Sequence, residues 1–496
     1  MTTTIEAPRA TQQMPPSSGR KTLRLVDLVL FSVSAILVAD TIGASAAIGV
    51  QGLTFWIALA VLFFVPYGLV TAELGSAWPQ EGGIYVWVRK AFGPFWGTMT
   101  SWLYWVNVAY WMPSVFVLFT GTLISVYFPA ISATGEALIV IGLIWFTVAV
   151  GITNLRMSKW VPNASAVIKV LVLGGLGAMG VAYAIGHGTA NSFAGGQWVP
   201  AWGDSWSFLP VIVYSYMGFE LMSSAGDAIR KPRRDVPKAI ALAGGVILAI
   251  YMFATFGVLA AVPLANVSIV TGIADALDVS FTAVFGGTNL LYHAMIVGLL
   301  FTFVGNMVTW SIGANHTVAA TGLDRTAPRV FGHTNRRFGT PDYAFYLMGI
   351  IGTALTIVNY ALFARREDVF WTIFAVSSIV FLLPYLLMFP AAIRLRTTQP
   401  AVDRPYRVRG GRWGMWLAAG LGELFVLATV VLFFQQVPEG TSAPLYWSVT
   451  GTATAVTVLI GWLLYRISSR RRPPADDADV AAPDAVAPAQ RLPVRG

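Results

Sequence analysis

The chain has 496 residues, of which 56% are apolar and only 11% are charged, and its formal net charge is +9 at pH 7. So large an apolar share excludes an ordinary soluble domain and predicts an integral membrane protein. Because the chain has no cysteine, a disulfide framework, a thiolate metal site and a cysteine nucleophile are all excluded.

In chain order, a polar segment at 1–24 is predicted to be a disordered N-terminus. Twelve apolar segments follow, each of roughly 18 residues or more, the length that crosses a bilayer. They lie near 25–50, 55–75, 95–124, 136–154, 165–186, 206–229, 239–262, 290–321, 342–363, 368–394, 413–434 and 445–466. The all-α membrane domain therefore covers 25–466, and 467–496 are predicted to be a disordered tail.

The loop charges predict how the chain is oriented. Lys and Arg collect before helix 1 and after helices 2, 4, 6, 8, 10 and 12, whereas the loops 127–135, 187–205, 263–281 and 435–444 contain neither. Only Arg365 and Arg366 break the alternation. Since Lys and Arg favour the cytoplasmic side, both termini are predicted to be cytoplasmic in a multi-pass protein of the plasma membrane, and the composition fits a bacterial one. The same asymmetry explains the net charge, so no nucleic-acid partner is inferred.

Two cytoplasmic regions are not predicted spans. In the segment 76–94, Gly82-Gly83 is followed by the apolar and aromatic run Ile84–Val88, which predicts an amphipathic helix lying along the membrane surface. The Pro-rich segment 398–411 is predicted to be a loop.

Two predicted spans are interrupted near their middle, at Ala39–Ser45 in helix 1 and at Tyr214–Glu220 in helix 6. Each interruption places a glycine and a carboxylate at bilayer depth, which is costly unless the segment lines a cavity or binds a ligand. Free N–H groups at the start of one half-helix suit a carboxylate, and free carbonyls at the end of the other suit an ammonium group. The alternative is that Gly43 and Gly218 only allow close helix packing.

Several separated motifs resemble those of the amino acid-polyamine-organocation (APC) superfamily: Ala72–Ala77, Gly82–Tyr85, Phe92–Pro94, Gly218–Glu220 with Lys231–Ala239, and Arg404–Val408. Within it, the helix 2 motif most resembles the glutamate/GABA antiporter branch. The resemblance implies two inverted five-helix repeats of the LeuT type, 25–186 and 206–394, with discontinuous helices 1 and 6. Helices 11 and 12, at 413–466, lie outside this core. It also implies alternating access to a site at the midplane of the membrane.

The resemblance further implies roles for individual residues. Backbone N–H groups of a small-residue triplet would hold a substrate carboxylate, carbonyls in helix 6 would accept its amino group, and aromatic residues of helices 3 and 8 would line the pocket. The residues predicted in this way are Thr41, Gly43, Ala44, Ser45, Tyr104, Tyr214, Met217, Gly218 and Trp310. Taken singly, these aromatics could equally be packing residues, since 13% of the chain is aromatic.

Three residues are predicted to serve coupling and gating. Glu220 matches an acidic position that the family links to proton-sensitive gating, and Phe219 is a candidate gate; a buried, permanently protonated Glu220 is the alternative. Lys169 matches a helix 5 lysine at the position where sodium-driven relatives bind the ion, which predicts sodium-independent transport. The alternative is that Lys169 extends its side chain to the cytoplasmic surface.

Asp40 departs from the family pattern, because related exchangers usually have a neutral residue just before the glycine triplet. An acid at this position disfavours glutamate and favours a neutral or cationic amino acid, or an amine without a carboxylate. Binding of a proton, or an ion pair with Lys169, are the alternatives.

The predicted function is secondary active transport of amino acids or related amines, as proton-coupled symport or as exchange. A polyamine transporter and a non-transporting amino acid sensor are the alternatives. No lysine follows a glycine, no Gly-x-Ser-x-Gly motif occurs, and His293 and His316 have no metal-ligand spacing, so no enzyme activity, cofactor or metal is predicted. The partners are the small substrate and the lipid bilayer; a monomer and a homodimer both remain open.

Overall fold

The computed structural model describes residues 23–80, 82–153, 160–200, 209–362, 366–435, 437 and 442–470. Most of the two predicted disordered ends, 1–24 and 467–496, therefore lies outside the described residues, as do Arg156 and Lys159 of the loop after helix 4. The regular structure of the described residues is helical, and an isolated bridge joins Leu23 to Ile229.

Ten helical segments of the described chain are long and apolar enough to cross a membrane. In the first repeat they are α3 to α4 (Gln51–Ala77), α6 (Pro94–Tyr127), α7 (Ala133–Thr153) and α8 (Trp160–His187). In the second they are α11 (Pro232–Ala261), α13 (Leu290–Leu323), α14 (Asp342–Leu362) and α15 (Arg366–Leu382) with α16 (Tyr385–Thr398). The last two are α17 (Gly411–Gln435) and α18 (Ala443–Ser469). The integral membrane class is thereby confirmed.

The two remaining predicted spans are the broken ones. Helix 1 consists of α1 (Leu25–Ile36) and α2 (Ile42–Ala46), and helix 6 consists of α10 (Leu209–Ser215) and a 3-10 helix, η3 (Phe219–Ala228). The helix 6 break, at 216–218, falls inside the predicted Tyr214–Glu220. The helix 1 break lies at 37–41 and overlaps the predicted Ala39–Ser45 only in part, because Ile42 to Ser45 are helical. Each break leaves pieces too short to cross a bilayer alone. The total of twelve spans remains a prediction, made up of ten continuous helices and two broken ones.

Helix 2 carries an irregularity that the sequence did not indicate. Between α3 (Gln51–Leu59) and α4 (Val65–Ala77), residues Ala60–Phe64 form one wide π-helical turn, η1. Such turns are rare and often occur at functional sites. Here the turn precedes Tyr67, whose hydroxyl reaches the break in helix 6.

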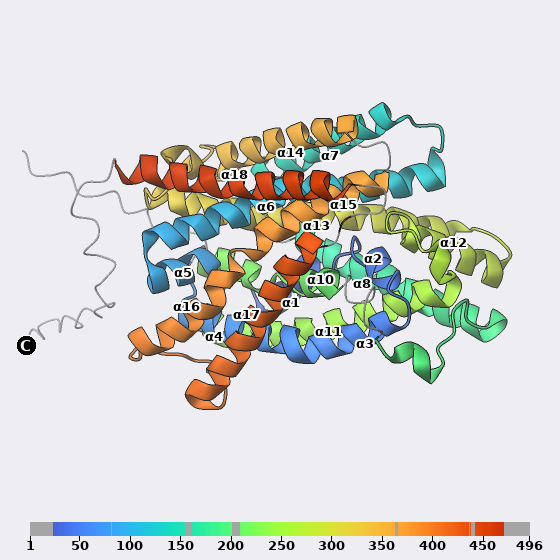
Figure 1. Cartoon of the computed structure of the whole chain (residues 1–496), viewed down its shortest axis with the longest axis horizontal. Helices are drawn as coiled ribbons and strands as arrows, with labels where there is room; N and C mark the ends of the chain where they lie inside the picture. Colours follow the sequence, from blue (N-terminus) through green and yellow to red (C-terminus); the bar gives the residue numbers. More distant parts are fainter. Residues whose placement is uncertain are drawn as a thin grey trace, which may run out of the picture.

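Two short helices flank the membrane domain at opposite ends (Figure 1). The predicted amphipathic segment is confirmed as a helix, α5 (Ile84–Phe92), which follows Gly83 at a positive φ of 49°. At the other end, α12 (Gly272–Phe285) occupies a segment that the charge argument treated as a loop. It ends at Gly286 in the left-handed region, a common helix stop.

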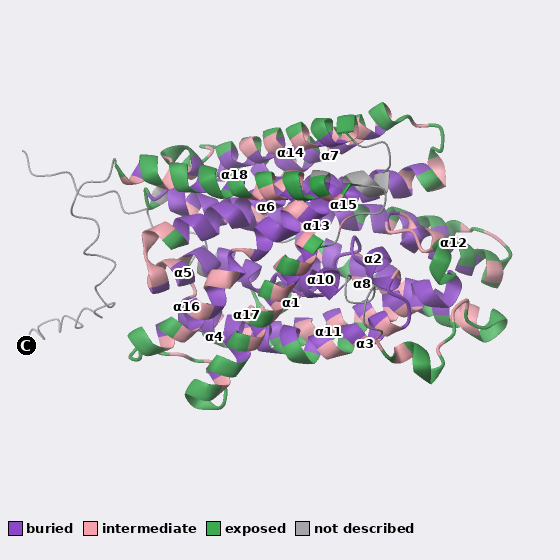
Figure 2. Cartoon of the chain, viewed as in Figure 1, coloured by how far each residue is buried: buried purple, intermediate pink, exposed green. Residues whose placement is uncertain are grey.

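The helices differ in how deeply they are buried, as Figure 2 shows. The most apolar stretch of α6 is 78% buried, whereas that of α18 is 17% buried. Apolar residues that face outward from α17, such as Leu417 and Leu424, are exposed in the isolated chain. Since lipid tails cover such surfaces in a membrane, α17 and α18 lie at the lipid boundary and α6 lies in the core.

Candidate functional site

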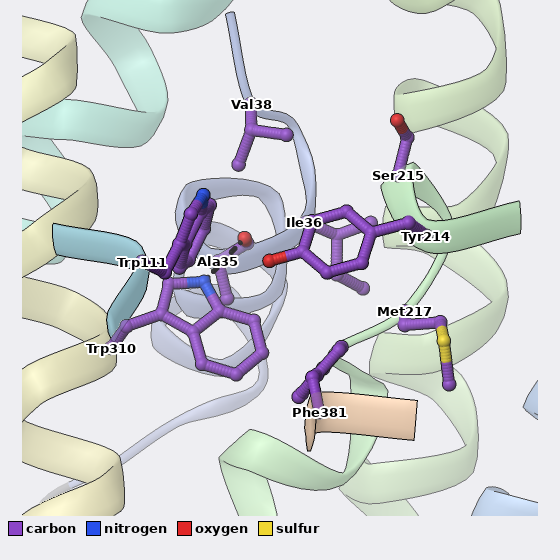
Figure 3. Close-up of a pocket in the computed structure, with 9 residues that line it drawn as sticks. All are labelled: Ala35, Ile36, Val38, Trp111, Tyr214, Ser215, Met217, Trp310 and Phe381. Atoms are coloured by element: carbon purple, nitrogen blue, oxygen red, sulfur yellow. Dashed lines mark hydrogen bonds between the residues drawn. The ribbon is translucent and has the colours of Figure 1, made fainter. Parts of the chain in front are cut away.

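A small cavity lies where the breaks of helices 1 and 6 meet α6, α13 and α15 (Figure 3). Its lining residues are Ala35, Ile36, Val38, Trp111, Tyr214, Ser215, Met217, Trp310 and Phe381. The cavity measures about 10 Å³, which is room for about one water molecule. An amino acid or amine therefore needs the lining side chains to move apart before it fits.

The walls of the cavity are mainly aromatic. The Trp111 and Trp310 rings meet edge to face with centroids 5.6 Å apart, and Phe381 lies 5.4 Å from Trp310. The Tyr214 ring is 5.9 Å from Trp111, and Figure 3 shows its hydroxyl pointing toward the two tryptophans. Because cations are attracted to aromatic faces, these walls suit an ammonium or guanidinium group.

Asp40 lies behind this wall, in the break of helix 1, and is 2% exposed. The Trp111 Nε1–H donates to Asp40 Oδ2 at 3.0 Å, while Asp40 Oδ1 has no hydrogen-bond partner among the described residues. Thr41 Oγ1 accepts from Ser215 Oγ at 2.7 Å, which ties the two breaks together. A buried carboxylate with a free oxygen is costly unless a cation or proton satisfies it.

The predicted triplet Gly43, Ala44 and Ser45 lies in α2, and none of the three is among the lining residues. A Cβ built on Gly43 would meet Ile269 O at 2.7 Å, so this glycine packs against the chain that leads into α12. The Ser45 N–H donates to Thr41 O at 2.9 Å within the helix. The structure thus does not bring these residues to the cavity, and their contact with a substrate carboxylate remains a prediction.

The predicted residues of helices 6 and 8 do come together. Tyr214, Met217 and Trp310 line the cavity, and Trp310 Nε1–H donates to Ala35 O at 2.8 Å. Gly218, at φ 131°, packs so closely that an added Cβ would lie 3.1 Å from Trp310 Cζ2. The left-handed backbone and the lack of space both favour glycine at this position.

Glu220, two residues after the break at Gly218, is held by three tyrosine hydroxyls. Tyr104 and Tyr385 donate to Glu220 Oε1 at 2.8 and 2.6 Å, and Tyr67 donates to Oε2. The Tyr67 oxygen also accepts from the N–H groups of Gly218 and Phe219, both at 2.9 Å. This one hydroxyl therefore caps the half-helix η3 and binds its carboxylate.

Phe219 packs into an aromatic stack beside this cluster. Its ring lies 4.8 Å from Phe64 and 5.6 Å from Tyr67. Phe219 therefore packs against helix 2 and is not among the residues that line the cavity. The gating role remains a prediction.

Lys169 is completely buried in α8, so its side chain does not extend to the cytoplasmic surface. Its Nζ donates to Ser34 O at 2.5 Å and to Asn306 Oδ1 at 2.9 Å. Ser34 is in turn bonded to Thr309 of α13 at 3.0 Å. The ammonium group therefore joins the end of α1 to α8 and α13, and the ion pairs among the described residues do not include one between Lys169 and Asp40.

Sequence reasoning missed several residues of the site. Trp111 follows Tyr104 by seven residues, or two helical turns, so the helical period places both on one face of α6 and could have indicated it. Phe381, Tyr67 and Tyr385 had no such signal, because only contacts of helices 2 and 10 with helix 6 bring them to the site.

The chain is similar to known membrane transporters. The family model described as "Amino acid permease" matches residues 23–460. A protein of Lactococcus lactis named "probable agmatine/putrescine antiporter" is 31% identical over 90% of this chain and 94% of its own length. An uncharacterized transporter of Legionella pneumophila is 27% identical over 85% of this chain and 91% of its own length. A polyamine transporter of rice is 24% identical over 80% of this chain and 71% of its own length.

The match covers the broken helices, the aromatic cavity and the buried charges described above. It confirms the superfamily that the sequence motifs indicated and the multi-pass membrane location. The chain therefore belongs to the amino acid permease family of the APC superfamily, and it is a membrane transporter of amino acids or amines.

Proposed function

We propose that this transporter carries cationic amines that lack an α-carboxylate, and that it exchanges them across the plasma membrane without sodium. The observation that carries this proposal is Asp40, a buried carboxylate with one unpartnered oxygen directly behind the aromatic wall. A cationic substrate would bind this free oxygen, and Trp111 and Trp310 supply faces for it to lie against.

The state of the backbone N–H groups also supports an amine. In helix 6, Tyr67 already occupies the N–H groups of Gly218 and Phe219. In helix 1, one of the three N–H groups of the predicted triplet, that of Ser45, is bonded to Thr41 O. An α-carboxylate would have to compete with these bonds, whereas a decarboxylated substrate does not need them.

The relatives support the same class of substrate. The bacterial relative is named as an agmatine/putrescine antiporter and the rice relative as a polyamine transporter. Agmatine and putrescine are cations without a carboxylate, which agrees with the acidic and aromatic character of the site. Exchange is accordingly the favoured mode over symport.

Alternating access is the proposed mechanism, in which a ligand stabilises a closed state between two open ones. Lys169 serves as the fixed positive charge between α1, α8 and α13, so no sodium ion is needed there. Glu220, with its three tyrosine donors, serves as the group that responds to protons.

Counterflow in proteoliposomes tests the proposal. Vesicles are loaded with unlabelled putrescine in sodium-free buffer, and uptake of labelled putrescine is measured with agmatine, arginine, ornithine and alanine as competitors. We expect agmatine and putrescine to compete, and Asp40→Asn to weaken their binding by about tenfold to a hundredfold because a buried charge loses its partner. Asp403→Asn, which removes an exposed carboxylate, is the matched control and leaves exchange unchanged.

Two results would contradict the proposal. If only amino acids with an α-carboxylate compete, the site binds the carboxylate even though the N–H groups of Gly218, Phe219 and Ser45 are already hydrogen-bonded. If the amines exchange equally well in Asp40→Asn but their pH dependence disappears, Asp40 binds a proton and not the substrate.

A further inference from the structure

A buried ion network at the cytoplasmic end joins two of the sequence motifs. These are Ala72–Ala77 of helix 2 and Arg404–Val408 of the loop after helix 10. The Glu73 carboxylate accepts from Arg396 Nε at 2.7 Å and from Arg396 Nη2 at 2.5 Å. It also accepts from the Val408 N–H at 2.8 Å, and Arg404 Nε lies 3.5 Å away. One carboxylate thus holds two guanidinium groups and the backbone of the loop.

The loop is folded around the same two arginines. Arg404 Nη2 donates to the carbonyls of Leu395 and Gln399, at 2.9 and 3.0 Å, and its guanidinium lies over the Trp78 ring at 5.2 Å. Arg396 Nη2 donates to Val408 O at 3.1 Å. The segment predicted from sequence as an ordinary loop is therefore a fixed structure docked on α4.

The three charged side chains are almost fully buried. The exposed fractions are 2% for Glu73, 8% for Arg396 and 7% for Arg404. Removing one partner from such a network leaves the others buried and unpaired, which costs far more than breaking a surface pair. The network thus holds α16 against α4 more strongly than an exposed ion pair would, such as the one between Arg233 of α11 and Asp403 of the loop.

The network links α4 to α16 at a place separate from the Glu220 cluster. Tyr67 of α4 and Tyr385 of α16 both bind Glu220, and Glu73 of α4 binds Arg396 of α16 nearer the cytoplasm. Between the two connections, Pro390 interrupts the backbone hydrogen bonds of α16. Since helices bend most readily at proline, the part of α16 beyond Pro390 can swing unless something holds it. Figure 1 shows α4, α5 and α16 gathered at the same end.

We propose that Glu73 is a latch, a positioning residue that holds the cytoplasmic half of α16 against α4 and keeps the cytoplasmic side of the Glu220 cluster closed. Opening of the transporter toward the cytoplasm breaks this network. Loss of the Glu73 charge shifts the population toward the open form. This inference goes beyond the proposed function, because it concerns conformation and holds whichever amine or amino acid is carried.

Labelling of a single cysteine tests the latch without any substrate. The chain has no cysteine, so Ser223→Cys gives one reporter thiol. Ser223 is 1% exposed, its hydroxyl has no partner among the described residues, and it packs against Gly75, two residues beyond Glu73 in α4. In inside-out vesicles, we expect Glu73→Gln to raise the maleimide labelling rate of this thiol about fivefold or more. Labelling from the outside should not rise.

Two further variants make the result decisive. Asp403→Asn removes a carboxylate of the same loop from an exposed pair, and labelling should stay at the starting rate. Arg396→Lys keeps the charge but loses the bidentate hydrogen bonding to Glu73. Its labelling rate should lie between those of the starting protein and Glu73→Gln, and it can be measured even if Glu73→Gln fails to fold. If Glu73→Gln and Arg396→Lys fold and labelling rises in neither, if it does not rise in the one of them that folds, or if Asp403→Asn raises it equally, the latch is overturned. Failure of amine counterflow would overturn the proposed substrate and leave this result standing.

Discussion

Asn107 is a buried residue whose side-chain amide lacks hydrogen-bond partners among the described residues. It is 1% exposed, and neither its amide oxygen nor its amide nitrogen has a hydrogen-bond partner among the described residues. It lies between Tyr104 and Trp111 on α6, at the spacing of one helical turn from each. Asn107 is not among the residues that line the closed cavity, but its helical spacing from Trp111, which does line it, predicts that it faces the cavity once this enlarges. A buried amide with no hydrogen bond is costly, so we predict that it binds a polar group of the substrate.

Replacement of Asn107 tests this reading. We expect Asn107→Leu to raise the half-saturating putrescine concentration about tenfold, because the substrate loses a hydrogen-bonding side chain, while the melting temperature stays the same or rises. The measurement is counterflow together with a thermal melt. A lower melting temperature with unchanged half-saturation would assign Asn107 to the fold and not to binding.

Glu220 is predicted to carry the pH response of transport. Glu220→Gln keeps the size and the ability to accept bonds from Tyr104 and Tyr385 but cannot exchange a proton. We expect exchange by this variant to become independent of pH between about 5 and 8, whereas the wild type varies over that range. A pH profile of initial rates measures this, and an unaltered profile would remove Glu220 from coupling. Tyr385→Phe is the control for loss of one bond.

At the level of elements, α12 and the broken helix 1 depend on each other. The chain entering α12 passes so close to α2 that a Cβ on Gly43 would meet Ile269 O at 2.7 Å and Ser268 O at 3.0 Å. Glycine is therefore needed at this position for packing between two elements, as the packing alternative for Gly43 proposed. A contact of its N–H with substrate is compatible with this but is not required by it.

Gly43→Ala tests the packing between these elements. The added methyl group overlaps backbone atoms that cannot rotate away, so we expect a loss of about 1–3 kcal/mol of stability, seen as a lower melting temperature. Gly142→Ala in α7 is the matched control, because a Cβ there would meet no atom within 4 Å. A Gly43→Ala variant as stable as the wild type would show that the backbone before α12 can move away from the added methyl group at little cost.

At the level of the whole molecule, the orientation in the membrane rests on loop charges. Two exposed loop residues at opposite ends, Thr334 and Thr189, provide single sites for labelling in the cysteine-free chain. We expect Thr334→Cys to react with an impermeant maleimide only in inside-out vesicles, and Thr189→Cys only in right-side-out vesicles. Reaction of both from the same side would refute the alternating topology and, with it, the cytoplasmic placement of the Glu73 network.

The sequence by itself determined the membrane class, the positions of the spans and the two breaks, because each depends on local hydrophobicity, charge and glycine content. It also led to Tyr214, Met217 and Trp310, which line the cavity. It missed α12, since a helix of mixed polarity outside the bilayer leaves no long apolar run.

Tertiary structure alone decided what the buried charges contact. Glu220 meets tyrosines from three other helices, Lys169 meets α1 and α13, and Glu73 meets arginines more than 300 residues away along the chain. In the sequence these residues are single charges in apolar surroundings. The sequence alone is equally consistent with a proton-carrying Glu220, a Lys169 at the membrane surface and an ordinary loop after helix 10. Their partners are set by helix packing between distant segments, which leaves no periodic or local pattern in the chain.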